Sequence, residues 1–320
     1  MNAFLLCPGR GSYGKPELGA LARSIGEIGD EARALVDQLE SQRAALQPGM
    51  PSLHELDSAP SFRPALHLKG EHASAIIFAC TLVDALRARR DSHPVLVGGN
   101  SLGFYSALVV SGAVSPSEGF RLVATMAELQ QSERGGQVLW TLIDDDWRLV
   151  PDRQTTLNAV LDQIPSAALS IRLGGHVIVA ANEEDMPALL DALPPVKVGK
   201  RDFPFRLAMH GPFHTDLLRG VADAGLTRLA DLDIRAPEIP LIDGRGYLWS
   251  PLSSDPAALL HYTLVTQVTS TFDFTEAVRV GLLDYAPERI DLLGPGTSLR
   301  APVGHILQHT GSPAKPWIGG

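Results

Sequence analysis

Residues 99–103 place a serine between two glycines, a spacing typical of a strained turn that exposes a nucleophile. The segment is Gly99, Asn100, Ser101, Leu102 and Gly103. In a G-x-S-x-G turn the glycines let a strand and the following helix approach closely, so the serine hydroxyl stands exposed where the helix begins. Free backbone N–H groups at that end stabilise developing negative charge. Ser101 is therefore the candidate nucleophile of a covalent catalyst.

The residues around this turn have the patterns of a strand before it and a helix after it. Residues 94–98 form a short apolar run, and residues 105–111 continue as an apolar helix. This context favours a nucleophile over the alternative, which is an ordinary glycine-rich turn between a strand and a helix. A serine nucleophile also needs a base. The chain has ten histidines, and position alone does not choose among them.

Two kinds of pattern divide the 320-residue chain. The outer parts, residues 1–135 and 208–320, combine apolar strands with long helices, as in an α/β domain with a parallel sheet. Residues 136–207 give short strands and helices in the order βαββαβ, which is the ferredoxin-like order. The sequence therefore predicts an α/β fold: a large α/β-hydrolase-like subdomain with a parallel sheet, and a ferredoxin-like small subdomain inserted into it.

The composition excludes several classes of protein. With 45% hydrophobic and 20% charged residues the chain is an ordinary folded protein, and a net charge of −9 argues against a nucleic-acid partner. Cys7 and Cys80 lie in apolar runs and are expected to be buried thiols in a reducing, cytoplasmic compartment. No apolar stretch reaches the ~18 residues of a membrane span. We expect a monomer with no metal, no cofactor and no membrane contact.

Three separated segments resemble the malonyl-CoA:acyl-carrier-protein transacylases and the acyltransferase domains of fatty-acid and polyketide synthases. Residues 8–12 are similar to the family's Pro-Gly-Gln-Gly-Ser, residues 99–108 to its Gly-His-Ser-Leu-Gly-Glu-Tyr-Ala-Ala-Leu, and residues 212–214 to its catalytic histidine segment. Their order and spacing also match, so the resemblance covers nearly the whole chain. It implies transfer of an acyl group between coenzyme A or one acyl-carrier protein and another, through an acyl-serine.

The resemblance also implies roles for individual residues. Ser101 is the nucleophile, and His214 is the general base that takes its proton. The backbone N–H groups of Arg10 and Leu102 form the oxyanion hole. The family uses a Ser-His dyad whose histidine is oriented by a backbone carbonyl, which by alignment comes from around Asp273.

Two further histidines need an interpretation. His210 lies one helical turn before His214 and is the rival base, but we interpret it as a hydrogen-bonded histidine near the site entrance. His176 lies in an apolar strand of the small subdomain and is interpreted as a structural histidine.

The predicted acyl pocket departs from the family. Met126 stands where the family has an arginine that pairs with the malonyl carboxylate, and a thioether cannot form that pair. Malonyl is therefore not the expected substrate. Asn100 replaces a histidine and Phe104 replaces a glutamate. Gly211, three residues before His214, removes bulk at a position that in polyketide acyltransferases relates to acyl choice, and Phe213 is also expected to line the pocket. Together these changes favour a larger or less polar acyl group.

Arg172 is the alternative source of a carboxylate clamp. The segment around it aligns with a part of the small subdomain that faces the acyl pocket in the family. In that case Arg172 would restore a malonyl site. The other interpretation is an arginine on the solvated side of a strand.

Three other functions stay open from the sequence. The same dyad would make a thioester hydrolase that releases acyl groups from a carrier protein by admitting water. Residues 9–14 contain G-x-G-x-x-G after a strand, which is a weak indication of a dinucleotide site, since residues 20–46 have a helical pattern where that site needs a second strand. A non-catalytic homologue that only binds carrier proteins is disfavoured by the retained Ser101 and His214.

Overall fold

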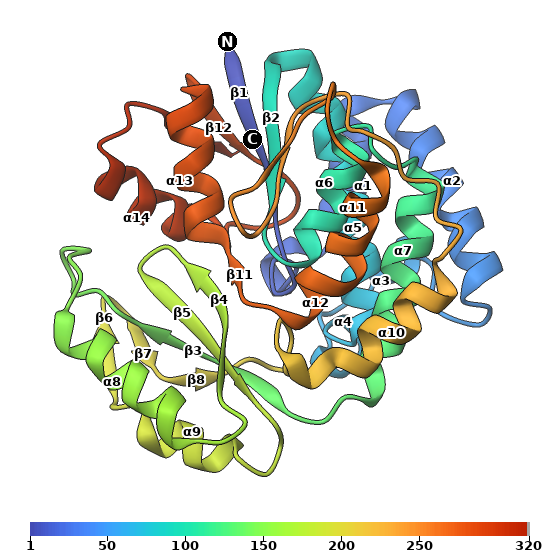
Figure 1. The fold of residues 1–320 in the computed structure, drawn as a ribbon. Helices are drawn as coiled ribbons and strands as arrows, with labels where there is room; N and C mark the ends of the chain where they lie inside the picture. Colours follow the sequence, from blue (N-terminus) through green and yellow to red (C-terminus); the bar gives the residue numbers. More distant parts are fainter. Residues whose placement is uncertain (319–320) are drawn as a thin grey trace.

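The computed structural model describes residues 1–318 and has an α/β fold built on two sheets (Figure 1). The larger sheet has the strand order β10–β9–β2–β1–β12–β13. Its strands are β1 (Asn2–Cys7), β2 (His93–Gly99), β9 (Leu241–Ile242), β10 (Leu248–Trp249), β12 (Arg289–Leu292) and β13 (Lys315–Ile318). All neighbours in this sheet are parallel except β9 and β10, which are antiparallel.

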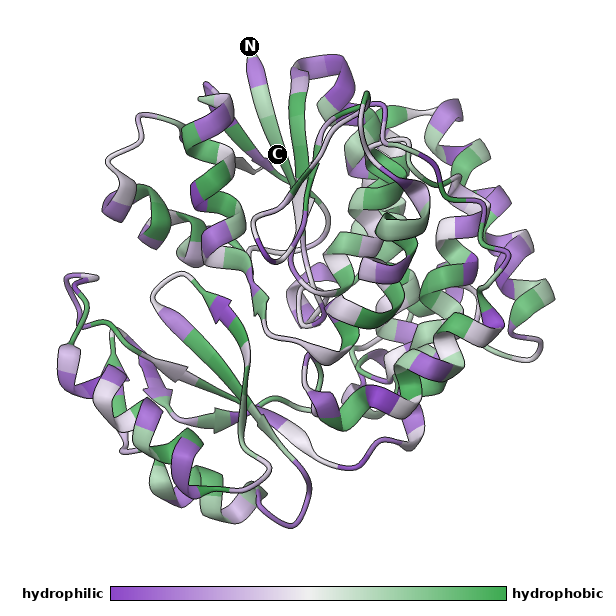
Figure 2. Cartoon of the chain, viewed as in Figure 1, coloured by the Kyte–Doolittle hydropathy of each residue, from purple (hydrophilic) through white to green (hydrophobic). Residues whose placement is uncertain are grey.

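The central strands of the larger sheet are covered by helices on both faces. Helices α5 and α6 contact β1 and β2, and α13 contacts β2; Figure 1 shows α13 and α14 on one side of these strands and α5, α6 and α7 on the other. Such double coverage explains why β1 is apolar almost throughout, since a parallel strand between helices has no solvated face. Figure 2 shows the hydrophobic residues along β1 and β2.

The α-helices around the larger sheet are α1 (Ala20–Ile28), α2 (Asp30–Leu46), α3 (Leu53–Asp57), α4 (Pro64–His67), α5 (Gly70–Asp91), α6 (Leu102–Val110), α7 (Pro116–Leu129), α10 (Arg219–Arg228), α11 (Pro256–His261), α12 (Gln267–Thr269), α13 (Phe274–Tyr285) and α14 (Arg300–Thr310). The short 3₁₀ turns are Lys15–Glu17, Gln130–Ser132 and Asp216–Leu218, and Tyr262–Thr266 is a π-helical turn between α11 and α12. Within residues 1–318, no helix combines the length and the apolar character needed to cross a bilayer.

The second sheet has the strand order β11–β4–β5–β3–β8. Its strands are β3 (Gly136–Thr141), β4 (Ala168–Leu173), β5 (His176–Ala181), β8 (Phe205–Arg206) and β11 (Phe272–Asp273), and its helices are α8 (Pro151–Gln163) and α9 (Met186–Ala192). The chain order from β3 to β6 (Val196–Val198) is the expected βαββαβ. Strand β11 comes from outside residues 136–207 and pairs with β4 in parallel, so it ties the second sheet to the C-terminal part of the chain.

The last strand expected in this region, residues 196–207, is instead three short strands. Strands β6 and β7 (Arg201–Phe203) form a separate hairpin, because Gly199 adopts a positive φ of 58° and turns the chain back. Pro204 then separates β7 from β8, since proline has no N–H to donate to a ladder. Only β8 joins the second sheet, beside β3.

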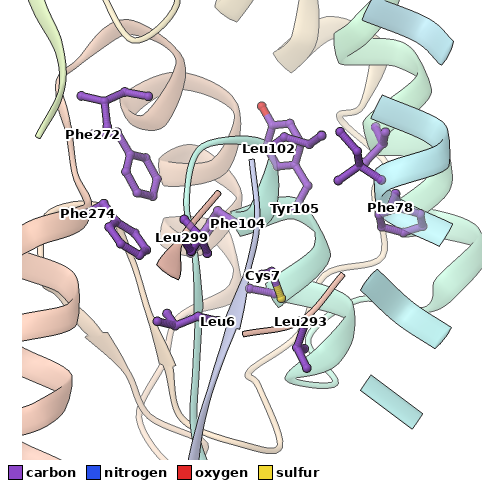
Figure 3. Packing of buried hydrophobic residues seen from close by; sticks show 14 of the residues in the cluster. Leu6, Cys7, Phe78, Leu102, Phe104, Tyr105, Phe272, Phe274, Leu293 and Leu299 are labelled. Atoms are coloured by element: carbon purple, nitrogen blue, oxygen red, sulfur yellow. The ribbon is translucent and has the colours of Figure 1, made fainter. Parts of the chain in front are cut away.

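The hydrophobic core lies where the larger sheet meets α5, α6 and α13. Figure 3 shows Leu6 and Cys7 of β1 in the same core as Phe104 and Tyr105 of α6. Phe104 is fully buried, and the centre of its ring lies 5.1 Å from the centre of the Tyr262 ring. The core therefore fixes the start of α6, the element on which the candidate nucleophile lies. Cys7 and Cys80 are buried free thiols, as expected.

Candidate active site

Ser101 lies at a strained turn between β2 and α6. It is the residue immediately before α6 and has a positive φ of 56°, a conformation that costs a non-glycine residue free energy. A Cβ on Gly99 would lie 2.3 Å from the backbone of Gly103, and a Cβ on Gly103 would lie 2.1 Å from the carbonyl oxygen of Cys7. Both glycines are therefore required by the close approach of strand and helix, as the spacing predicted.

The loop after β1 packs directly against this turn. A Cβ on Gly9 would lie 2.7 Å from the carbonyl oxygen of Asn100, so Arg10 follows a point of backbone contact with the turn. Leu102 is the first residue of α6, and an N–H at that position has no acceptor within its own helix. The loop that carries Arg10 therefore packs against the turn that carries Ser101 and Leu102, which is consistent with the predicted oxyanion hole.

Ser101 and His214 form a hydrogen-bonded pair. The Oγ atom of Ser101 lies 2.7 Å from Nε2 of His214. The Nδ1 atom of His214 lies 2.6 Å from the carbonyl oxygen of Gln267, and because a carbonyl only accepts, Nδ1 carries the proton. Nε2 is then free to accept the hydroxyl proton of Ser101, as a general base must.

The carbonyl that orients His214 belongs to Gln267, so the expectation that it comes from around Asp273 is wrong. Gln267 begins α12, a helix of only three residues that follows a π-helical turn, and the carbonyls of a last helical turn have no acceptor role within the helix. Asp273 instead caps α13, where its carboxylate accepts from the N–H of Glu276 at 2.8 Å. The two positions lie six residues apart in the chain.

Burial keeps the candidate base neutral. His214 is 5% exposed, and burial lowers its pKa to about 4 even though the bond to Gln267 acts in the opposite direction. Neutral imidazole is the form that accepts a proton, so His214 is in its basic form at neutral pH. His210 has its Nδ1 atom 2.7 Å from Oε1 of Gln137, and its ring lies 5.8 Å from the ring of Phe213, whereas the histidine paired with Ser101 is His214. Burial also lowers the pKa of His210, and the Arg10 charge adds to that effect.

Two cavities of very different size meet at Ser101. The larger has a volume of about 720 Å³ and extends from the loop after β1 across the second sheet. The smaller has a volume of about 30 Å³ and lies between α6, α7 and α12. Arg10, Ser101 and Phe213 line both. At ~10–15 Å³ for one water, the smaller cavity holds only a few atoms.

The structure brings three of the predicted pocket residues to these cavities and leaves two outside. Met126 lines the smaller cavity, Asn100 the larger, and Phe213 both. Arg172 lines neither: it points to the other side of β4, where its Nε lies 3.4 Å from the carboxylate of Asp273. Alternate residues of a strand face opposite sides, so the prediction that Arg172 faces the acyl pocket is wrong. Gly211 also lines neither cavity and lies against the Phe213 ring.

The side chain of Arg10 is a feature that sequence reasoning missed. The resemblance implies a role only for its backbone N–H, yet its guanidinium donates to the carbonyl oxygen of Met209 at 2.7 Å and lies 5.1 Å from the ring centre of Phe213. Burial lowers the pKa of Arg10 to about 10. Arg10 therefore ties the loop after β1 to the segment that carries His214. An arginine in place of the family's glutamine was the available signal.

His176 lines the larger cavity, whereas the sequence interpretation gave it only a structural role. Its Nδ1 atom lies 3.0 Å from Oγ1 of Thr141, and its ring lies 5.3 Å from the ring of Phe203 and 5.0 Å from that of His305. Burial lowers the pKa of His176 to about 4. The side chain is thus satisfied by its neighbours, as expected, and also forms part of the cavity wall.

Sequence relatives of the chain come from polyketide and fatty-acid biosynthesis. No protein-family model matches it. It is 27% identical over 326 residues to the polyketide biosynthesis protein ThaF of Burkholderia thailandensis, covering all of this chain and 26% of that protein. It is 24% identical over 210 residues to the malonyl CoA-acyl carrier protein transacylase of Salmonella typhimurium, covering 64% of each. The chain thus spans about a quarter of the first relative and less than two thirds of the second.

Solved structures with the same fold cover nearly the whole chain. The malonyl-CoA:acyl carrier protein transacylase of Xanthomonas oryzae matches with a TM-score of 0.77 and 21% identity, over 98% of this chain and 93% of that one. A malonyl-transacylase solved in complex with a type II polyketide synthase acyl-carrier protein also matches with a TM-score of 0.77, at 20% identity, over 100% of this chain and 96% of that one. The chain is thus similar in sequence to polyketide and acyl-carrier-protein transacylase proteins and has the fold of the malonyl-CoA:acyl-carrier-protein transacylases, which its three segments resemble.

Proposed function

We propose that this protein transfers an acyl group, other than malonyl, between coenzyme A or an acyl-carrier protein and another acyl-carrier protein in polyketide or fatty-acid-type biosynthesis. The observation that carries the proposal is the 2.7 Å contact between Ser101 and His214, with His214 oriented by Gln267. The complex of a related transacylase with its acyl-carrier protein supports a carrier protein as the partner.

The first half of the proposed reaction acylates Ser101. Nε2 of His214 takes the hydroxyl proton while Oγ of Ser101 attacks the thioester carbonyl carbon. The N–H groups of Arg10 and Leu102 stabilise the oxyanion, a contribution of ~3–4 kcal/mol for one donor in comparable sites. The C–S bond then breaks, and His214 returns the proton to the leaving thiolate. In the second half, an acceptor thiol takes the acyl group by the same steps in reverse.

The walls around Ser101 support a neutral acyl group. Met126 lines the smaller cavity and offers no charge to a carboxylate. The Arg172 guanidinium pairs with Asp273 and lines neither cavity, which argues against the alternative in which it clamps malonyl. The Arg10 guanidinium is held by Met209 and Phe213. In the smaller cavity a buried carboxylate would therefore lack a dedicated partner, which is strongly disfavoured; Arg201 lines only the larger cavity.

The two sheets support the proposed division of the chain. Residues 136–207 contribute the order β8–β3–β5–β4 to the second sheet, which we interpret as the ferredoxin-like small subdomain. Residues 1–135 and 208–320 make up the α/β-hydrolase-like subdomain; the last two residues of that range lie outside the described chain. The catalytic pair spans this division, since Ser101 precedes the insertion and His214 follows it.

Intact-mass measurement with an acyl donor and a second carrier protein tests the proposed function. The enzyme is incubated with acetyl-, butyryl-, octanoyl- or malonyl-coenzyme A and a holo acyl-carrier protein, and the acyl-enzyme, acyl-carrier and free acid are quantified. We expect a neutral acyl group on the enzyme and then on the carrier. Dominant free acid would instead identify a thioester hydrolase, and preferred malonyl loading would contradict the proposed substrate class.

A further inference from the structure

The face of the second sheet that lines the larger cavity carries a continuous row of apolar side chains. Register places Ile171 opposite Ile178, Ile178 opposite Leu139, and Leu139 opposite Phe205. All four residues line the cavity that also contains Ser101. The row crosses strands β4, β5, β3 and β8, which at ~4.8 Å between neighbours is ~14 Å wide.

The residues between these positions face the other way. Val138 and Trp140 alternate with Leu139, and Val177 and Val179 alternate with Ile178; these four are 0–1% exposed and line neither cavity. The helices α8 and α9 cover that second face (Figure 1). A sheet with one face under helices needs apolar residues only on that face, so the fold does not require the apolar row on the cavity side.

The larger cavity, which this apolar row lines, is big enough to enclose a small molecule. Its 720 Å³ falls in the ~300–1,000 Å³ range of sites that enclose a small molecule. Phe203 and Leu207 extend the apolar wall beyond the row, and Figure 2 shows hydrophobic residues along β4 and β5 in this part of the molecule. On the other side of Ser101, the smaller cavity of about 30 Å³ has no space for more than the first atoms of an acyl chain.

We propose that the apolar row is a subsite for the hydrocarbon chain of a medium-length or long acyl thioester. The inference rests on the proposed function, because it places the acyl carbonyl at Ser101. The chain then lies along the sheet face in the larger cavity, and apolar burial favours it. Each methylene group that leaves water strengthens binding by up to about fourfold.

A ladder of acyl N-acetylcysteamine thioesters tests this subsite. Acetyl, butyryl, octanoyl and dodecanoyl thioesters are offered to the full-length protein, and the rate of Ser101 acylation is followed by intact mass. The short N-acetylcysteamine arm keeps most of the cavity free for the acyl chain. We expect the acylation efficiency, kcat/KM, of the octanoyl thioester to exceed that of the acetyl thioester at least tenfold. Efficiency that is flat or falls with chain length overturns the proposal.

A variant that fills the row provides the matched comparison. Leu139→Trp puts a larger side chain at the centre of the row and is expected to reduce the octanoyl-to-acetyl ratio at least tenfold. Leu149→Trp is the control, because Leu149 is 57% exposed in the same subdomain and lines neither cavity; its ratio should equal that of the wild type. Phe205→Ala, on the edge strand, serves as a second variant if Leu139→Trp does not fold, and it should also lower the ratio.

The possible outcomes distinguish a failure of the proposed subsite from a failure of the proposed function. If Leu139→Trp lowers acetyl and octanoyl acylation by the same factor, the cavity holds only the thiol arm and the subsite is wrong. If no thioester of any length acylates Ser101 in the folded wild type, the proposed function itself fails. Acylation by short thioesters alone leaves the function standing and rejects the subsite.

Discussion

Nε2 of His214 lies 2.7 Å from Oγ of Ser101, although 113 residues separate them in the chain. Residues 136–207, which supply β3, β4, β5 and β8 of the second sheet, account for most of that separation. The contact joins the residue immediately before α6 to a histidine held by Gln267, the first residue of α12. The first two predictions concern this pair.

Ser101→Ala should abolish the acyl-enzyme. Without Oγ there is no atom to form the ester, so no acyl mass should appear on the protein during incubation with an acyl thioester. Ser106→Ala is the control, because Ser106 is fully buried on the same helix and lines neither cavity. Acyl mass retained by Ser101→Ala would show that another residue is the nucleophile.

His214→Ala should slow acylation by ~10²–10⁴-fold, the usual contribution of a positioned general base. His210→Ala should change the rate by less than tenfold, because the His210 ring is hydrogen-bonded to Gln137 and not to Ser101. Single-turnover acylation rates of the two variants give the comparison. A reversed order of effects would assign the base to His210.

The acylation rate should stay constant with pH between about 6 and 8 and fall only in strong acid. Burial lowers the pKa of His214 to about 4, so the basic form is lost as the pH falls through about 4. An ordinary histidine would begin to lose activity near its unperturbed pKa of ~6.5. The pH dependence of kcat/KM reports this group in the free enzyme. Loss of half the rate near pH 6.5 would mean that His214 is not shielded from water.

Gly103→Ala should destabilise the protein by ~3 kcal/mol or more, because its Cβ would overlap the carbonyl of Cys7 at 2.1 Å. Gly26→Ala should have the opposite effect on stability. Gly26 lies in α1, and nothing lies within 4 Å of the added Cβ, so alanine should stabilise the helix by ~0.5–1 kcal/mol. Chemical denaturation of both variants measures the difference. Equal stabilities would show that the strand and helix do not require this close approach.

The sequence by itself determined the turn that carries Ser101 and the α/β class of the fold. The G-x-S-x-G spacing predicted a close approach of a buried strand and a helix. The structure has this approach, because a Cβ on Gly99 or Gly103 would overlap neighbouring backbone atoms. The order βαββαβ likewise follows from local periodicity, because the spacing of apolar residues in each strand or helix indicates which of its faces is buried. Arg10, Leu102 and His214 followed from the resemblance, and the structure brings all three to Ser101.

Only the tertiary structure decided what those residues contact. Whether Gln267 or Asp273 supplies the carbonyl to His214 depends on a π-helical turn and a three-residue helix, which leave no periodic signal. Whether Arg172 faces the cavity or Asp273 depends on strand register, and a shift of one residue reverses the face. The sizes of the two cavities at Ser101 depend on how the second sheet packs against the loop after β1 and the helices α6, α7 and α12. Long-range packing sets these features. The local pattern of residues along the sequence does not specify which distant residues come into contact.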